Sequence, residues 1–201
     1  MIISGSIDSD REKIFIDKCV SLYEKLLSGE KFLVLVLNPY LKNKFIKCFT
    51  ERIKQIDYEK IKILTFNGLC YNSFRDNEDY IKSLIKCDKN EVLNLSGLEV
   101  SQYIFKQCIK ENDFSDYISK VNLLHQLFRR YSLIVNNCLT EKEVRERSLL
   151  LKESFYNEAQ KAIDEYKNKT FKYKSFDYLR QSAVLPLIYR NTDYFKDIKY
   201  L

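Results

Sequence analysis

The chain has 201 residues, of which 45% are hydrophobic and 14% aromatic, and its formal net charge is +6 at pH 7. This apolar content suffices for a packed core and excludes a disordered chain, and the moderate positive charge permits nucleic-acid binding without requiring it. Only four glycines and two prolines are present, which argues against an all-β sandwich rich in turns.

The six cysteines are spread along the chain without a C-x-x-C pair, and His125 is the single histidine. No zinc-binding spacing can be assembled from these residues, so we predict no metal site. Several of the cysteines sit among apolar residues and are expected to fill the core in a reducing compartment. The N-terminus shows no signal-peptide pattern, and the longest apolar run, Phe32–Leu37, is too short to span a bilayer. These features predict a cytoplasmic protein without membrane contact.

The first sixteen residues predict a short buried strand, Met1–Ser4, a tight loop at Gly5 and a helix that begins at about Asp10. Ser9 and Glu12 have the spacing of a capping box at the start of this helix. A strand, a glycine loop and a helix N-terminus form the arrangement in which phosphate-binding folds hold a nucleotide. Free backbone N–H groups and the helix dipole face the anion there.

The loop departs from the phosphate-loop template G-x-x-x-x-G-K-[ST]. Gly5 fits the first glycine and is followed by Ser6, but Asp10, Arg11 and Glu12 stand in place of Gly, Lys and Ser/Thr. Asp10 adds a negative charge, Arg11 lacks the compact ammonium group of lysine, and Glu12 replaces the hydroxyl that binds magnesium. We therefore predict a degenerate phosphate loop that does not bind nucleotide. An ordinary capped helix after a strand is the alternative.

The next part of the chain alternates between apolar runs of strand length and amphipathic helices. This order predicts a parallel α/β layout, whose ligands lie beyond the carboxyl ends of the strands. The predicted elements are a strand at Phe32–Leu37, a helix from Asn38-Pro39 to about Ile56, a strand at Ile61–Phe66 and a short helix from Leu69 to Arg75.

Residues 81–170 have the pattern of an all-helical insertion. The pair Ser96 and Glu99 forms a capping box, and so does the pair Thr140 and Glu143, which predicts two helix starts. The second box leads into a single long helix that ends near Lys169. A leucine-rich stripe between the two boxes predicts a further helix.

The last part of the chain returns to the α/β pattern. Lys167–Lys174 is a basic run interleaved with Phe171 and Tyr173, which suits either nucleic-acid contact or a flexible connection. Ser175 then caps a helix, and Tyr194–Leu201 starts like another buried strand.

In this order, the features resemble the N-terminal ATPase domain of UvrD/Rep-type superfamily 1 DNA helicases. Met1–Ile16 looks like the first strand and phosphate loop of that family, and Phe32–Ile53 looks like its second strand, single-strand contact motif and following helix. Thr65–Cys70 resembles the Thr-Phe-His motif of the family, with Asn67 in place of the histidine. The helical block resembles the inserted subdomain, and Ser175–Leu201 resembles the run that leads to the Walker B strand.

The resemblance implies a partial RecA-like P-loop fold with parallel strands. Residues 1–80 then form the RecA-like α/β part, residues 81–170 the helical insertion, and residues 171–201 the return to the α/β part, which ends in an incomplete strand. By position, the family's contacts with single-stranded nucleic acid fall on Pro39, Tyr40, Lys42, Asn43, Thr65, Phe66 and Asn67. Structural interpretations also exist, since Asn38-Pro39 suits a helix start, Phe66 suits the core and Asn67-Gly68 suits a turn.

The departures from the family decide the expected activity. The phosphate loop lacks its key residues, no adenine-recognising glutamine motif precedes the first strand, and the chain ends before the Asp-Glu pair that holds magnesium. We expect a helicase-derived module that contacts single-stranded DNA without hydrolysing ATP or holding a cofactor. ATP and Mg²⁺ would be expected only if the resemblance outweighed the degenerate loop. Two alternatives stay open: an N-terminal fragment of an ATP-dependent helicase, whose partner is the remaining sequence, and a non-catalytic scaffold for another protein.

Overall fold

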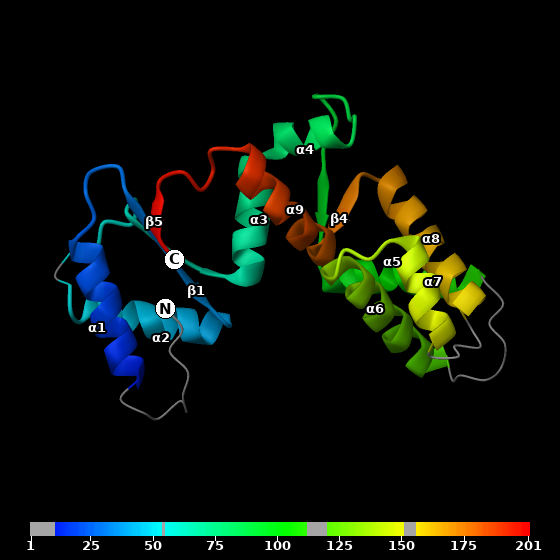
Figure 1. Ribbon diagram of the computed structural model, residues 1–201, viewed down its shortest axis with the longest axis horizontal. Coiled ribbons are helices and arrows are strands. Elements are labelled where there is room, and N and C mark those ends of the chain that lie inside the picture. Colours follow the sequence, from blue (N-terminus) through cyan, green and yellow to red (C-terminus); the bar gives the residue numbers. More distant parts are fainter. Residues whose placement is uncertain (1–10, 54, 112–119, 151–155) are drawn as a thin grey trace. The chain divides into compact units, whose positions relative to one another are not determined.

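The computed structural model describes residues 11–53, 55–111, 120–150 and 156–201. Within these residues the chain is a mixed α/β protein, and it divides into two compact units (Figure 1). Unit 1 comprises Met1–Asp76 and Leu187–Leu201, and unit 2 comprises Asn77–Pro186. Unit 2 is therefore inserted into the sequence of unit 1.

Unit 1 is built on a three-stranded sheet of β1 (Lys31–Val36), β2 (Ile61–Thr65) and β5 (Ile198–Tyr200). The strand order is β2-β1-β5, and both pairings are parallel. The predicted parallel α/β layout is thus confirmed at this level. The strand predicted at Met1–Ser4, the loop at Gly5 and the cap at Ser9 lie outside the described residues.

Three helices accompany this sheet: α1 (Arg11–Glu24), α2 (Pro39–Thr50) and α3 (Phe66–Asp76). α1 and α2 lie next to each other beside the sheet (Figure 1). Their apolar side chains share one cluster with those of the sheet. The strands supply alternate residues such as Phe32 and Val34 to this cluster, because successive side chains point to opposite faces. Two predicted boundaries are wrong, since α2 ends at Thr50 rather than near Ile56 and Phe66 begins α3 rather than ending a strand.

Unit 2 is mainly helical but contains a two-stranded sheet. Its helices are α4 (Glu78–Leu84), α5 (Leu98–Glu111), α6 (Lys120–Asn136), α7 (Glu141–Leu150), α8 (Tyr156–Lys172) and the first part of α9 (Tyr178–Asn191). β3 (Asn94–Ser96) pairs in parallel with β4 (Ser175–Asp177). The prediction of an all-helical insertion is therefore wrong. Strands of three residues are too short to show an alternating pattern in the sequence.

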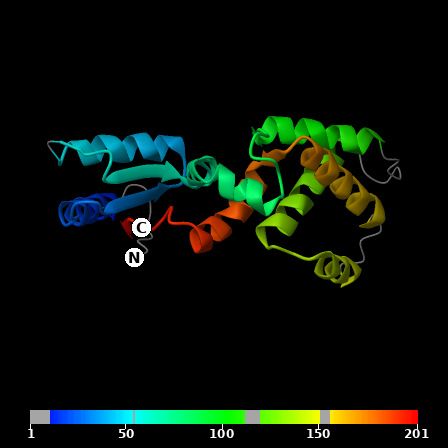
Figure 2. The ribbon, with the colours of Figure 1, turned by 90° about the horizontal axis from the view of Figure 1, so that it is seen from above.

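The core of unit 2 is rich in aromatic side chains. α5 packs against α6 and α8, as Figure 2 shows from above. Phe105 lies 4.5 Å from Tyr166 and 5.9 Å from Tyr131 between ring centroids. All three side chains are completely buried. The predicted leucine-rich stripe of α6 contributes Leu127 to the same cluster, which confirms it.

The predicted helix starts of unit 2 have mixed outcomes. The box at Thr140 is confirmed, because its backbone N–H donates to Glu143 Oε2 at 2.8 Å and Glu143 N–H donates to Thr140 Oγ1 at 3.3 Å. The helix predicted to open at the Ser96 box is confirmed as α5, which begins at Leu98. Ser96 itself does not cap it, because Ser96 ends β3 and accepts a hydrogen bond from Ser175 Oγ at 3.1 Å. Ser175 likewise lies in β4 rather than capping a helix. Asp177 caps α9 instead, through a 2.9 Å hydrogen bond from the Arg180 N–H to its Oδ1.

Two further predictions for unit 2 need correction. The single long helix after Thr140 is described as α7 and α8, with residues 151–155 between them outside the description. The basic run Lys167–Lys174 is no flexible connection, because α8 continues to Lys172 and Thr170 within it is completely buried.

Candidate functional site

The carboxyl ends of β1 and β2 lie side by side at one edge of the sheet in unit 1. Val36 is paired with Thr65 in the parallel register, so Leu37 and Phe66 leave the sheet at the same level. Ligands of parallel α/β sheets bind beyond this edge, because the segments that follow the strands converge there. The fold therefore brings together the two segments that the sequence predicts to contact nucleic acid.

The segment after β1 is fixed by a helix cap. Asn38 Oδ1 accepts a 2.9 Å hydrogen bond from the backbone N–H three residues later, and Pro39 occupies the first turn of α2. The predicted helix start is confirmed. Tyr40 follows in this first turn with 73% of its surface exposed, while Pro39 and Asn43 are exposed and Lys42 is half-buried.

The segment after β2 is fixed in a similar way. Thr65 Oγ1 accepts a 3.1 Å hydrogen bond from the Gly68 N–H and so caps α3. Phe66 is 50% exposed and Asn67 is exposed in the first turn of this helix. Phe66 is therefore not a buried core residue, and the interpretation of Asn67-Gly68 as a separate turn is wrong. A β-carbon at Gly68 would lie 3.2 Å from Thr65 Oγ1, so glycine keeps this cap compact.

Three large side chains, Leu37, Tyr40 and Phe66, are thus exposed at one edge of one sheet. Single exposed apolar residues are ordinary, but neighbouring ones at the ends of adjacent strands form a surface that can take a flat apolar ligand. Lys42 adds a cation to the same segment. The arrangement can stack bases and attract phosphate groups.

A hollow of about 220 Å³ lies beside this edge, between the first turns of α1 and α2. Its walls are mostly apolar and include Phe15, Leu35 and Phe45. Glu12 and Lys44 also line it, and their carboxylate and ammonium groups are 2.7 Å apart. The hydrogen bond to Glu12 raises the pKa of Lys44 above its ordinary value. Sequence reasoning missed Lys44, because no local pattern reveals a pair separated by 32 residues.

The predicted phosphate-loop residues are only partly described. Gly5, Ser6 and Asp10 lie outside the described residues. Arg11 is the first residue of α1, and nothing is described of its side chain. Glu12 is therefore the one member of this set whose side-chain contact is known, and it is engaged by Lys44.

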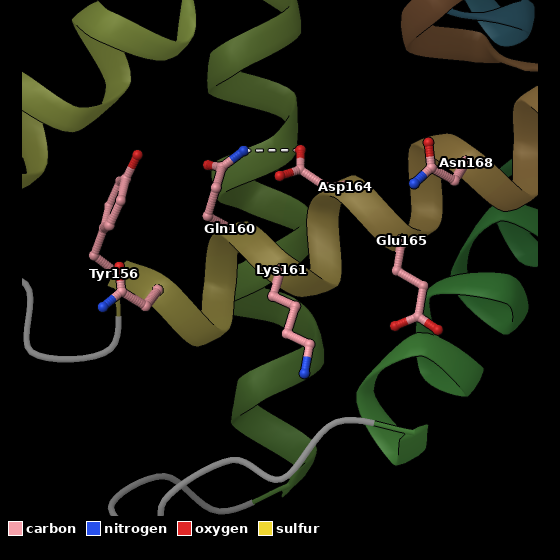
Figure 3. Close-up of a pocket in the computed structure, with 7 residues that line it drawn as sticks. Tyr156, Gln160, Lys161, Asp164, Glu165 and Asn168 are labelled. Atoms are coloured by element: carbon pink, nitrogen blue, oxygen red, sulfur yellow. Dashed lines mark hydrogen bonds between the residues drawn. The ribbon is translucent and has the colours of Figure 1, made fainter.

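A second, wider hollow of about 710 Å³ runs along α8 in unit 2 (Figure 3). Its described lining comes from this one helix. Gln160 Nε2 donates to Asp164 Oδ1 at 2.9 Å, and the carboxylate of Glu165 lies 3.8 Å from Lys169 Nζ. These two pairs run along the helix and are not directed at a common point. Gln160 Oε1 is buried without a hydrogen-bond partner among the described residues.

The thiols and the histidine offer little chemistry. In the part of the chain that the structure describes, no group of three or more His, Cys, Asp or Glu could hold a metal ion. Burial raises the pKa of Cys19 to about 12 and that of Cys70 to about 11. Both thiols therefore stay protonated and are poor nucleophiles at neutral pH. His125 is exposed on α6.

Asp177 is a buried carboxylate that sequence reasoning did not single out. Its Oδ2 accepts hydrogen bonds from Tyr131 at 2.9 Å and from Tyr166 at 2.8 Å, and its Oδ1 caps α9. Asp177 and both tyrosines are completely buried. Because the group is sealed from solvent and bonded to donors from three segments, its role is to hold unit 2 together.

Comparisons with known proteins do not assign the chain: no model of a protein family matches it, and no curated protein matches its sequence. The similarity to UvrD/Rep-type helicases therefore stays a prediction. No helix among the residues described is long and apolar enough to cross a membrane.

Proposed function

We propose that the chain is a helicase-derived module that contacts single-stranded nucleic acid at the carboxyl edge of its three-stranded sheet, and that it does not hydrolyse ATP on its own. The observation that carries the proposal is the exposure of Tyr40 and Phe66 at the ends of adjacent parallel strands. Bases of any sequence stack on exposed aromatic side chains, and each stack contributes about 1–3 kcal/mol.

The chain order of unit 1 supports this proposal. β1 and β2 precede the inserted unit 2 and β5 follows it, yet β5 pairs with β1 in parallel. The resemblance to UvrD/Rep-type helicases implies this order, with Ser175–Leu201 returning to the α/β part. We also propose that unit 1 has a RecA-like fold.

The position and contact of Glu12 support the proposal that the chain does not hydrolyse ATP. A carboxylate at the start of α1 repels a triphosphate, and Lys44 binds this carboxylate at 2.7 Å rather than being left for a phosphate. We expect the unaltered chain to show no binding of a fluorescent ATP analogue. The variant Asp10→Gly, Arg11→Lys, Glu12→Thr restores the template residues and is expected to bind it better. Tight binding by the unaltered chain would contradict this part of the proposal.

Nucleic-acid contact is tested by fluorescence anisotropy of a labelled oligothymidylate, titrated with the full chain at low and moderate salt. We expect binding that weakens with salt, because phosphate contacts release counterions. Phe66→Ala and Tyr40→Ala are each expected to weaken binding about tenfold, which corresponds to one lost stack. Melting curves show whether each variant is folded.

Tyr58→Ala is the matched control. Tyr58 is 63% exposed in the same unit, but it precedes β2 and so lies toward the amino end of that strand. Its replacement should leave binding unchanged. No binding by the unaltered chain at tens of micromolar would overturn the proposal and favour the scaffold for protein contacts.

A further inference from the structure

The last turn of α8 and the turn that leads from it to β4 carry two exposed aromatic side chains in unit 2. Phe171 is 57% exposed and Tyr173 is 60% exposed. The chain reverses at Lys174, whose φ of 48° lies in the left-handed region. The basic run that the sequence analysis singled out is therefore an ordered surface.

Lysine side chains lie over both rings. Lys174 Nζ is 4.9 Å from the centroid of Phe171, and Lys172 Nζ is 5.9 Å from the centroid of Tyr173. Ammonium groups are attracted to the faces of aromatic rings at such distances. Each ring is thus held beside a cation, while more than half of its surface faces solvent.

Backbone hydrogen bonds hold the turn in place. Tyr173 N–H donates to Lys169 O at 3.1 Å, and Lys174 N–H donates to Phe171 O at 3.0 Å. Asn94 of β3 then donates twice, from its side-chain Nδ2 to Tyr173 O and from its backbone N–H to Lys174 O, each at 2.9 Å. Because the turn is ordered by the protein itself, a ligand loses less entropy in binding it than in binding a flexible segment.

The charge around the turn favours an anionic ligand. Lys174 Nζ lies 3.8 Å from Glu91 Oε2, which places the loop before β3 next to the turn. Within these two segments the cations outnumber the anions: Lys86, Lys89, Lys172 and Lys174 against Asp88 and Glu91. Lys172 is exposed on this surface.

We propose that Phe171, Lys172, Tyr173 and Lys174 form a second contact for single-stranded nucleic acid, in unit 2. Aromatic rings interleaved with cations match a polyanion whose bases are unpaired and free to stack. A phosphate group takes the place of Glu91 beside Lys174. This surface shares its ligand class with the proposed function but has residues of its own, so the two can be tested separately.

The test is anisotropy of a labelled oligothymidylate with the full chain and the double variant Phe171→Ala, Tyr173→Ala. Both side chains are exposed, so the variant is expected to melt like the unaltered chain. Each lost stack is expected to weaken binding about tenfold, so the affinity of the double variant should fall at least tenfold. Lys172→Gln is expected to reduce the slope of log affinity against log salt by about 0.7, the value for one phosphate contact.

Tyr103→Ala is the matched control, since Tyr103 is 64% exposed on α5 in the same unit. Unchanged binding by this control together with loss in the double variant supports the second contact, even if Tyr40→Ala and Phe66→Ala bind normally. Loss confined to Tyr40→Ala and Phe66→Ala overturns the second contact and leaves the proposed function standing. Equal loss in Tyr103→Ala, or no binding by the unaltered chain, overturns it as well.

Discussion

Aromatic side chains are placed in opposite ways at the sheet edge of unit 1 and in the core of unit 2. At the sheet edge of unit 1, Tyr40 and Phe66 are exposed, whereas in the core of unit 2 Tyr131 and Tyr166 are completely buried. A buried hydroxyl needs a hydrogen-bond partner, and Asp177 supplies one acceptor for both tyrosines. Water satisfies an exposed hydroxyl and leaves the ring free for a ligand. For tyrosine, the partner of the hydroxyl therefore distinguishes the buried core residues Tyr131 and Tyr166 from Tyr40 on the proposed binding surface.

Removing Asp177 should break this contrast most severely. Asp177→Ala leaves two buried hydroxyls without their acceptor, at about 1–3 kcal/mol each, and removes a helix cap, at about 1 kcal/mol. We expect the free energy of unfolding from urea titrations to fall by about 3–7 kcal/mol in total. If the variant does not fold, Asp177→Asn keeps one acceptor and should show an intermediate loss. Glu146→Ala, on the exposed face of α7, should leave the stability unchanged.

Phe49→Ala tests the core of unit 1 in the same way. Phe49 is completely buried, stacks on Phe45 at 5.4 Å between centroids and meets Tyr23 edge-on at 5.6 Å. Large-to-small changes of this kind cost about 3–5 kcal/mol. Thiol labelling followed by mass spectrometry should show faster reaction of buried Cys19 in unit 1, while Cys108 in unit 2 reacts as before.

Equal acceleration at both thiols would contradict this expectation, because it would mean that the two units unfold as one. Leu27→Ala is the matched control, since Leu27 is exposed in unit 1. It should change neither labelling rate.

A milder change is expected from Tyr166→Phe. It removes one donor to Asp177 and should lower the free energy of unfolding by about 1–3 kcal/mol at neutral pH. Burial, followed by the charge of Asp177, raises the pKa of Tyr131 and Tyr166 above their ordinary value. The folded chain therefore keeps protons that the unfolded chain loses above about pH 10.

The stability from these two groups is complete below about pH 10 and is lost as the pH rises further. Urea midpoints should therefore fall from about pH 9 to about pH 11, and less steeply in Tyr166→Phe than in the unaltered chain. An equal slope in both proteins would argue against the raised pKa of Tyr166.

The smallest effect is expected at the ion pair of Glu12 and Lys44. Both side chains are more than a third exposed, so water and salt screen their attraction. A double-mutant cycle of Glu12→Gln and Lys44→Met should give a coupling much smaller than the losses above, and added salt should reduce it further. If the coupling free energy of Glu12 and Lys44 were as large as that of Tyr166 and Asp177, exposure would not weaken the ion pair as we expect.

Local signals predicted the elements of this chain well, and long-range contacts escaped them. The strand after Lys31 was found because its side chains are buried on both faces, and the Thr140 capping box was found because its two residues are three apart. Ser96 has the same spacing to Glu99, and a helix does begin at Leu98, but Ser96 pairs with β4 instead of capping that helix. Ser96 pairs with Asp177, and these residues lie too far apart along the chain for any local sequence pattern to link them.

The same division holds for the candidate site. Tyr40 and Phe66 could be predicted because the resemblance places strand contacts just beyond the carboxyl ends of two apolar strands, and parallel strands bring those ends to one edge. The contact of Lys44 with Glu12 could not be predicted, because it depends on how α1 and α2 pack. For the ordered turn at Phe171, the sequence leaves nucleic-acid contact and a flexible connection open, since its basic composition suits either.

The hydrogen bonds of Asp177 also affect the kinetics of unit 2. They join segments that are 11 and 46 residues away along the chain, so they close only after α6, α8 and β4 have met. Contacts that form late in folding slow unfolding more than they speed folding. We therefore expect Asp177→Ala to speed the unfolding of unit 2 more than it slows its folding, and so to shorten the lifetime of the folded unit.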